Sequence, residues 1–145
     1  MWNEILNEES WKSFMTSINY FHDSCIKELM YVSGAYVDNN LCMHPLNDKR
    51  LLRVILQQQN NEHPMIELEF SGLKYLKLFP IDEQYTCEIL DASMLLKDNL
   101  IYWGDCSELN QLDAENSGTT ICATKLRWRF IKGYMGKELY FNLPT

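Results

Sequence analysis

The sequence predicts an α+β domain, in which an N-terminal helix packs on a curved, mostly antiparallel sheet of six to eight strands. Near the start, apolar residues recur at spacings of three and four, which is the period of a helix. From residue 26 onwards, apolar and polar residues alternate in short segments separated by turn residues, which is typical of strands. Strands with such short connections must pair antiparallel. We therefore expect a barrel-like or sandwich-like sheet, with residues 1–145 forming a single domain.

The helix is expected over residues 4 to 18. Its apolar face is formed by Ile5, Trp11, Phe14, Met15 and Ile18. Acidic residues near its start suit the positive end of the helix dipole. A helix this short is not stable alone, so it must cover the apolar face of the sheet.

Strands follow along the rest of the chain. We expect them at residues 26–37, 51–58, 65–70, 73–79, 85–92, 94–96, 100–103 and 119–131. Ser71 and Gly72 either form a tight hairpin or bulge one long bent strand, and the bulge is the preferred interpretation. Segments 42–48 and 104–118 are expected as loops, and the aromatic tail, 133–145, either forms one more edge strand or lies over the surface.

The alternation also places charges on one face of the sheet. In segment 65–70, the apolar residues point inward and the outward positions are Glu67 and Glu69. In segment 119–131, one face carries Cys122, Leu126, Trp128 and Phe130, and the other carries Lys125, Arg127 and Arg129. We expect these cations to pair across strands with Glu67, Glu69 or Glu88. Because Trp128 lies on the opposite face from the cations, it cannot stack on a base beside them, and nucleic acid is not an expected partner.

Composition narrows the class of partner. The net charge of −7 opposes binding to nucleic-acid phosphates and anionic membranes, and it favours cationic partners. The five cysteines are odd in number and form no CxxC motif, so we expect reduced thiols in a cytoplasmic protein. The N-terminus lacks the basic and apolar regions of a signal peptide, and no apolar run approaches the roughly 20 residues that cross a bilayer. No membrane partner is therefore expected.

His22 and Asp23 form the only adjacent His–Asp pair in the chain, at the corner between helix and strands. Such a pair can bind a metal or act in acid–base catalysis. The other histidines, His44 and His63, fall in expected loops, so convergent partners are lacking. We interpret the corner as structural, with Asp23 or Ser24 accepting hydrogen bonds from nearby backbone N–H groups. No catalytic residue, metal ligand or cofactor is predicted.

Four acidic residues in the long expected loop are a second candidate for metal binding: Asp105, Glu108, Asp113 and Glu115. An EF-hand needs oxygen ligands at alternate positions and a central glycine, and this loop lacks that pattern. We interpret it as a solvated loop.

Two short motifs resemble a pattern in small bacterial proteins, which include some immunity proteins of polymorphic toxins. The first motif comprises Phe21, His22, Asp23, Ser24 and Ile26, and the second comprises Ile66, Leu68, Phe70, Gly72 and Leu73. The resemblance covers about the central half of the chain and implies no catalytic residues. It implies a cytosolic binding protein that blocks a toxin, and the charge of −7 would suit a basic one.

Three functional hypotheses follow. The first is a non-enzymatic cytosolic protein-binding domain, which would be an immunity protein neutralising a basic toxin, with candidate partner-binding residues His22, Asp23, Tyr36, Glu67 and Glu69. The second is a small-ligand-binding or enzymatic domain with a cleft near His22, Asp23 and Tyr36. The third is a structural subunit that self-associates into a homo-oligomer through an exposed sheet edge, such as segment 119–131, or through the aromatic tail.

Overall fold

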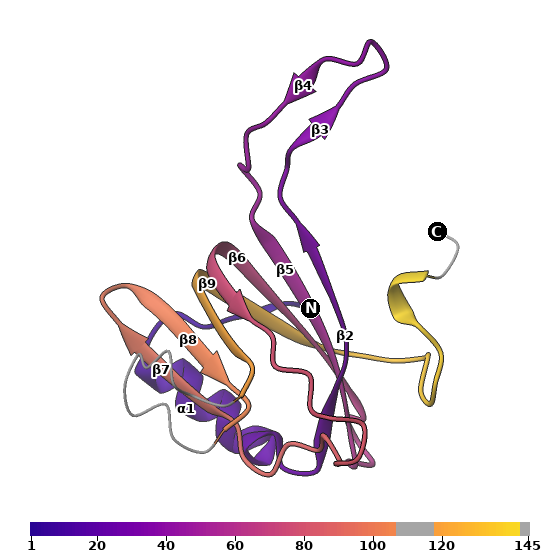
Figure 1. Cartoon of the computed structure of the whole chain (residues 1–145). Helices are drawn as coiled ribbons and strands as arrows, with labels where there is room; N and C mark the ends of the chain where they lie inside the picture. The colour runs from indigo at the N-terminus through magenta and orange to yellow at the C-terminus, as the bar shows by residue number, and fades with distance from the viewer. Residues whose placement is uncertain (107–117, 143–145) are drawn as a thin grey trace.

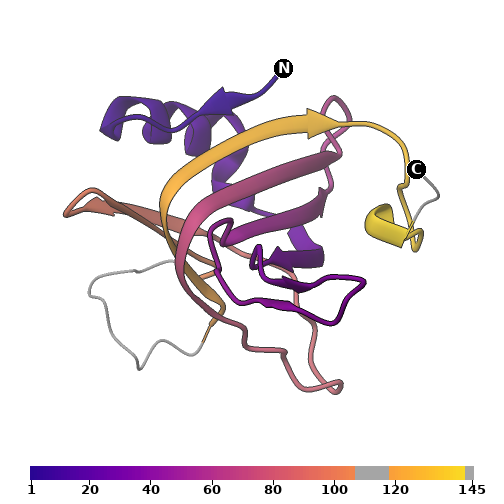
Figure 2. The same ribbon diagram turned by 90° about the horizontal axis from the view of Figure 1, so that it is seen from above.

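A computed structural model describes residues 1–106 and 118–142, and shows one helix packed on a curved seven-stranded sheet (Figures 1 and 2). The strands of this sheet are β1 (Asn3–Glu4), β2 (Ser24–Val32), β5 (Leu51–Gln58), β6 (Met65–Lys77), β7 (Ser93–Lys97), β8 (Leu100–Gly104) and β9 (Thr120–Ile131). Their order is β2-β5-β6-β9-β8-β7, β1 also pairs with β9, and every described pairing is antiparallel. The α+β prediction is confirmed at this level. The sheet is not closed into a barrel, because β2 and β7 end the strand order.

The helix α1 spans Glu8–Ser17, and it is shorter at its start than expected. Asn7 and Ser10 form a capping box, in which the Ser10 N–H donates to Asn7 Oδ1 at 2.9 Å and the Asn7 N–H donates to Ser10 Oγ at 3.0 Å. The cap satisfies free N–H groups of the first turn and so sets where the helix begins. The residues before the cap are therefore not helical, and Asn3 and Glu4 pair with β9 as strand β1.

The core lies between α1 and the inner face of the sheet. Phe14 of α1 stacks on Trp128 of β9 at 4.3 Å between ring centroids. Phe21 lies in a 3-10 turn, η1 (Asn19–Phe21), and is fully buried, with edge-to-face contacts to Phe14 at 5.7 Å and Trp103 at 5.6 Å. Aromatic pairs of this geometry contribute beyond the area that they bury. The turn between helix and sheet is therefore anchored by one side chain.

Strands β6 and β9 form the longest pairing and bend together at one point. Gly72 has a φ of +61°, a conformation that other residues adopt at a cost, and an added Cβ would collide with Thr124. This confirms one bent strand rather than a hairpin at Ser71 and Gly72. A register shift between Leu73 and Tyr75 follows.

Beyond this bend the prediction for one side chain of β9 is wrong. Ile121 and Ala123 belong to the core cluster with Leu126, whereas Cys122 is buried outside that cluster. Cys122 therefore does not share a face with Leu126, because both strands change the side that they turn to the core at the bend, between Phe70 and Leu73 on β6 and between Leu126 and Ala123 on β9.

Two further expectations fail. Residues 85–92 form no strand and pair with the sheet at a single bridge, Ser24 to Ile89, although Ile89 and Ala92 pack in the core. β9 is an interior strand, with β6 on one side and both β8 and β1 on the other, so it is no free edge for self-association. Of the two alternatives for the tail, the edge strand is not formed in its described part: this part contains a 3-10 turn, η2 (Tyr140–Asn142), and the carbonyl oxygen of Tyr134 accepts a hydrogen bond from Gln57 Nε2 of β5 at 3.1 Å.

Residues 33–50 form a projecting arm, which stands clear of the sheet beyond β2 and β5 (Figure 1). The arm holds two short paired strands, β3 (Tyr36–Val37) and β4 (Met43–His44). The sequence instead predicted one strand over 26–37 and a loop over 42–48. The turn at Gly34, with a φ of +100°, separates β3 from β2. Within the described part of the chain, no helix has the length and apolar character needed to cross a bilayer.

Candidate functional site

The corner of His22 and Asp23 is held by its backbone and by Ser24. The Asp23 N–H donates to the carbonyl oxygen of Ile89 at 3.0 Å, and the buried Ser24 hydroxyl donates to the carbonyl oxygen of Phe21. Ser24 thus donates a hydrogen bond where the sequence analysis expected Asp23 or Ser24 to accept one. His22 Nδ1 donates to the carbonyl oxygen of Leu90, and this bond together with the nearby Asp23 carboxylate raises the pKa of His22.

The corner shows little of the geometry of a chemical site. His22 Nε2 lies 3.6 Å from Asp23 Oδ2, and both side chains are about half exposed. The nine residues of β2, about 30 Å of strand, separate this corner from Tyr36, so the three residues do not line one cleft. Within the described ranges, no group of three or more His, Cys, Asp or Glu side chains is placed to hold a metal ion.

The acidic loop falls largely outside the described residues, which exclude Glu108, Asp113 and Glu115. Asp105 is described, and its Oδ1 accepts a hydrogen bond from the Thr119 N–H at 2.9 Å. Burial raises the pKa of Asp105. The Asp105 carboxylate therefore holds the backbone just before β9 by a hydrogen bond.

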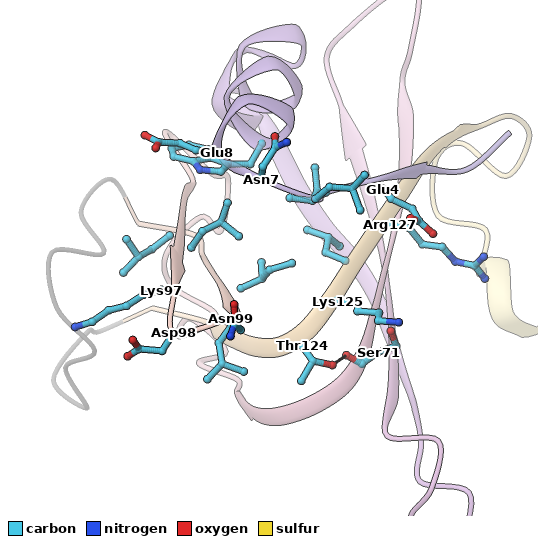
Figure 3. A pocket seen from close by; sticks show the side chains of 18 of the residues that line it. Glu4, Asn7, Glu8, Ser71, Lys97, Asp98, Asn99, Thr124, Lys125 and Arg127 are labelled. Atoms are coloured by element: carbon cyan, nitrogen blue, oxygen red, sulfur yellow. Dashed lines mark hydrogen bonds between the residues drawn. The ribbon is translucent and has the colours of Figure 1, made fainter.

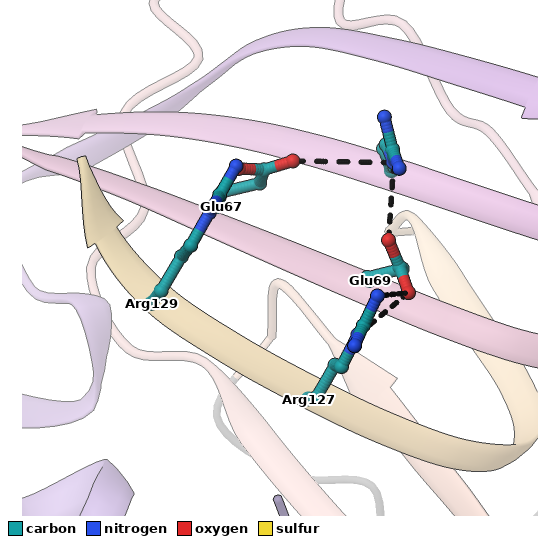
Figure 4. Close-up of polar contacts among 5 residues, drawn as sticks. Glu67, Glu69, Arg127 and Arg129 are labelled. Atoms are coloured by element: carbon teal, nitrogen blue, oxygen red, sulfur yellow. Dashed lines mark hydrogen bonds and ion pairs between the residues drawn. The ribbon is translucent and has the colours of Figure 1, made fainter. Parts of the chain in front are cut away.

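An ion network crosses three strands on the sheet face opposite the helix (Figure 4). Arg127 Nη2 lies 2.7 Å from Glu69 Oε1, and Arg129 Nη2 lies 2.7 Å from Glu67 Oε2. Arg53 of β5 adds a contact of 3.1 Å to Glu69. These pairs confirm the predicted cross-strand pairing for Arg127 and Arg129, with Glu69 and Glu67; Lys125 is not part of the network, and the exposed Glu88 is not among the partners.

The carboxylates of this network lie beneath the guanidinium groups. The side chains of Glu67 and Glu69 are 1% and 6% exposed, whereas those of the arginines are 33–41% exposed. A partner approaching this face would meet the arginines first, so Glu67 and Glu69 are not the accessible residues that the sequence analysis proposed. Trp2 completes the surface, because the guanidinium groups of Arg127 and Arg129 lie 4.4 and 4.3 Å from the centre of its ring.

The arm presents apolar side chains to solvent. The exposed ones are Tyr36, Val37, Leu41, Met43 and Leu46, of which Leu41 is 86% exposed. Its tip is nevertheless ordered by polar contacts: the Asp38 carboxylate accepts hydrogen bonds from His44 Nε2 at 3.0 Å and from the Cys42 N–H at 3.0 Å. The bond from His44 is the main reason why the pKa of Asp38 is lowered. The Tyr36 and His44 rings stack at 4.5 Å between centroids.

A pocket of about 870 Å³ lies between β1, the start of α1 and the hairpin of β7 and β8 (Figure 3). We call it the hairpin pocket. Its floor is β9 at Thr124, Lys125 and Leu126, between Ala123, where the pairing with β8 ends, and the hydrogen bond from the Ile5 N–H to the carbonyl oxygen of Leu126. Its walls are mixed, with apolar side chains from α1, from the link between β1 and α1, and from β7 and β8, and with charged side chains at both ends.

Sequence reasoning placed only part of these sites. Of the five candidate residues, it correctly joined Glu67 and Glu69 to a cation network, and it named Tyr36 without recognising the arm. It missed Trp2, the apolar arm tip and the hairpin pocket. Trp2 and the tip residues carry no local signal, whereas the run of turn formers from Asp38 to Asn40 between apolar residues was a usable signal for a hairpin.

Comparisons of the chain with protein-family models, with curated proteins and with solved structures found no match. Function is therefore inferred from the arm, the ion network and the hairpin pocket themselves.

Proposed function

We propose that this chain is a non-enzymatic protein-binding domain and that the projecting arm is its main contact with the partner. The observation that carries the proposal is the exposure of five large apolar side chains on a segment outside the core. Exposed apolar clusters on soluble domains usually mark interaction surfaces, because their burial in a complex is favourable. A partner that encloses the arm would bury Leu41 and Met43 from both sides.

The order at the arm tip also supports binding. A two-stranded hairpin alone is marginally stable, and the pairing of β3 with β4 covers only two residue pairs. Asp38 and His44 add side-chain contacts that hold the tip in one conformation. Preorganisation of this kind lowers the entropic cost of association. The tip is thus built as a contact element that needs little ordering when it binds.

The negative net charge of the chain supports a cationic partner. More specifically, we propose that this chain is an immunity protein that neutralises a basic toxin in the cytoplasm. The chain carries a net charge of −7, whereas the arm, residues 33–50, balances Asp38 and Asp48 against Lys49 and Arg50, so the excess negative charge lies outside the arm. An acidic surface accelerates encounter with a basic partner, and this effect weakens as salt increases. The resemblance of the Phe21–Ser24 motif to immunity proteins points in the same direction.

The test compares three versions of the chain as affinity baits: the wild type, Leu41→Ser/Met43→Ser, and the control Leu78→Ser. Leu78 is exposed to 52% and lies outside the arm, so the control removes a similar side chain elsewhere. A specific partner should bind the wild type and the control, and lose at least tenfold in affinity for the arm variant when its dissociation constant is measured with purified proteins. Equal affinity for all three would refute the role of the arm.

The immunity form has its own test. Co-expression with a toxin encoded beside this protein should rescue growth, and the arm variant should lose that rescue while remaining folded. If a partner binds through the arm but is not toxic, the protein-binding proposal is supported and the immunity proposal is refuted.

A further inference from the structure

We propose that the hairpin pocket binds a small amphipathic oxyanion, that is, an apolar chain ending in a carboxylate or phosphate group. This site is separate from the arm and does not depend on the proposed protein-binding function. The inference rests on the shape of the pocket, on the cation Lys125 beside Arg127 and on the apolar walls.

The shape of the pocket favours a compact ligand over an added strand. The ladder between β8 and β9 ends at Ala123, and the ladder between β1 and β9 begins at Arg127. The Ile5 N–H also donates to the carbonyl oxygen of Leu126 at 3.0 Å, so only Thr124 and Lys125 of β9 stay unpaired between the two ladders, about 7 Å of strand closed at both ends by protein. A volume of about 870 Å³ lies within the range of small-molecule sites.

Lys125 supplies the positive charge for the head group. It is exposed on β9, and its ammonium group has no ion-pair partner among residues 1–106 and 118–142. Arg127 lies two residues further along the same face, about 7 Å away, and it keeps N–H donors beyond the Nε and Nη2 that bind Glu69. An oxyanion between these two side chains would accept charge-assisted hydrogen bonds from both.

The acidic residues that line the pocket do not occupy the end that holds Lys125. Glu69 is neutralised by Arg53 and Arg127, and Glu8 is paired with Lys12 at 2.6 Å. Asp98 also lines the pocket, but it lies beside Lys97 in the turn of β7 and β8, away from Lys125 (Figure 3). Glu4 is exposed on β1, opposite Arg127 in the strand register, so it is the carboxylate nearest to the proposed head-group site. Figure 3 shows Glu4 beside Arg127 and Lys125 nearer to Ser71 and Thr124.

The apolar walls supply a place for the chain of the ligand. The side chains that form them are Ile5, Leu6, Trp11, Leu95, Leu96, Leu100, Ile101 and Leu126. Most are buried or partly buried, but Leu6 is 76% exposed at the mouth of the pocket. An alkyl chain lying against Leu6 and Trp11 would remove this apolar surface from water.

The experiment is a calorimetric titration of the full chain with decanoate below its aggregation concentration. Decanol, which lacks the charge, and inorganic phosphate, which lacks the chain, serve as partial ligands. Decanoate should bind at least about tenfold more tightly than either, because only it uses both ends of the pocket. Decyl phosphate distinguishes the two head groups, and the tighter of the two anions identifies the class.

Matched variants locate the binding. Lys125→Gln should weaken decanoate binding about tenfold, whereas Lys137→Gln, an equal charge change outside the pocket, should leave it unchanged. Leu6→Asn should also weaken it, and Glu4→Gln should tighten it by removing repulsion. These side chains are exposed, so the variants are expected to fold, and circular dichroism verifies this.

The proposal is overturned if the wild type does not bind decanoate or decyl phosphate, if Lys125→Gln binds as well as the wild type, or if phosphate alone binds as tightly as decanoate. The arm variant Leu41→Ser/Met43→Ser should bind decanoate normally, so failure of this site and failure of the protein-binding proposal are distinguishable.

Discussion

Removing Arg129 should destabilise the fold far more than removing Arg127, although both arginines pair with a glutamate on β6. Glu67 is 1% exposed, and its Oε2 receives the Nε and Nη2 of Arg129 at 2.8 and 2.7 Å. Once Arg129 is replaced by Gln, the nearest cation in the network is Arg53, whose Nε lies 4.0 Å from Glu67 Oε1. That oxygen already has no hydrogen-bond partner in the described structure. The carboxylate would therefore be buried and nearly unpaired.

The expected magnitudes differ because the two glutamates keep different partners. Removing one member of a buried ion pair lowers the free energy of unfolding by about 3 to 5 kcal/mol. Because the Arg129 side chain is one third exposed, we expect a loss of about 3 kcal/mol for Arg129→Gln. Arg127→Gln leaves Glu69 bound to Arg53 at 3.1 Å, so its cost should be about 1 kcal/mol. Glu67→Gln combined with Arg129→Gln removes the stranded charge and should recover part of the loss.

Urea unfolding followed by far-ultraviolet circular dichroism measures these free energies. Tryptophan fluorescence is unsuitable, because Trp2 stacks on both arginines and would report their removal directly. Equal destabilisation by Arg129→Gln and Arg127→Gln, or no recovery in the double variant, would refute the reasoning that Glu67 depends on one partner.

Three other predictions concern the bend and the corner. Gly72→Ala should cost about 2 kcal/mol in urea unfolding, because φ is +61° and the new Cβ meets Thr124; a loss below 0.5 kcal/mol would contradict that collision. Phe21→Ala should cost about 4 kcal/mol, since the ring is fully buried, and a loss near 1 kcal/mol would mean that the turn is not anchored there. The hydrogen bond to Leu90 and the Asp23 carboxylate raise the pKa of His22, so the stability that His22 contributes is present below its ordinary pKa of 6.5 and is lost as the pH rises through the raised value. The difference in stability between the wild type and His22→Ala should therefore shrink with rising pH, and a constant difference would contradict this.

Prediction from sequence succeeded where a local pattern had one physical solution. Alternation in segment 65–70 places Ile66 and Leu68 inward and Glu67 outward, and the structure has this arrangement because only one face can pack on α1. The pairing of Glu67 with Arg129 followed from two such strands with opposite charges on one face. Capping by Asn7 and Ser10 is equally local, and reading it would have placed the start of the helix correctly.

Prediction failed where the outcome depended on what lies beside a segment. Residues 85–92 alternate as a strand does, but alternation forms a strand only where the segment runs alongside a neighbouring strand and pairs with it. There the chain meets β2 at one bridge, between Ser24 and Ile89. The arm fails for a related reason, since Tyr36 and Val37 have high strand propensity and nothing in their sequence shows that they pair only with Met43 and His44, away from the sheet.

The α+β class, the positions of most strands, the acidic charge and the pairing of Glu67 and Glu69 with cations could be predicted from the amino-acid sequence, because each depends on periodicity, composition or the neighbouring strands. Only the folded chain shows that these glutamates lie under their arginines, that Trp2 covers the same surface, that the arm leaves the sheet and that Thr124 and Lys125 of β9 stay unpaired at the floor of the hairpin pocket. These features depend on contacts between segments far apart in the chain. Local propensity carries no information about such contacts, and the packing of the whole sheet sets them.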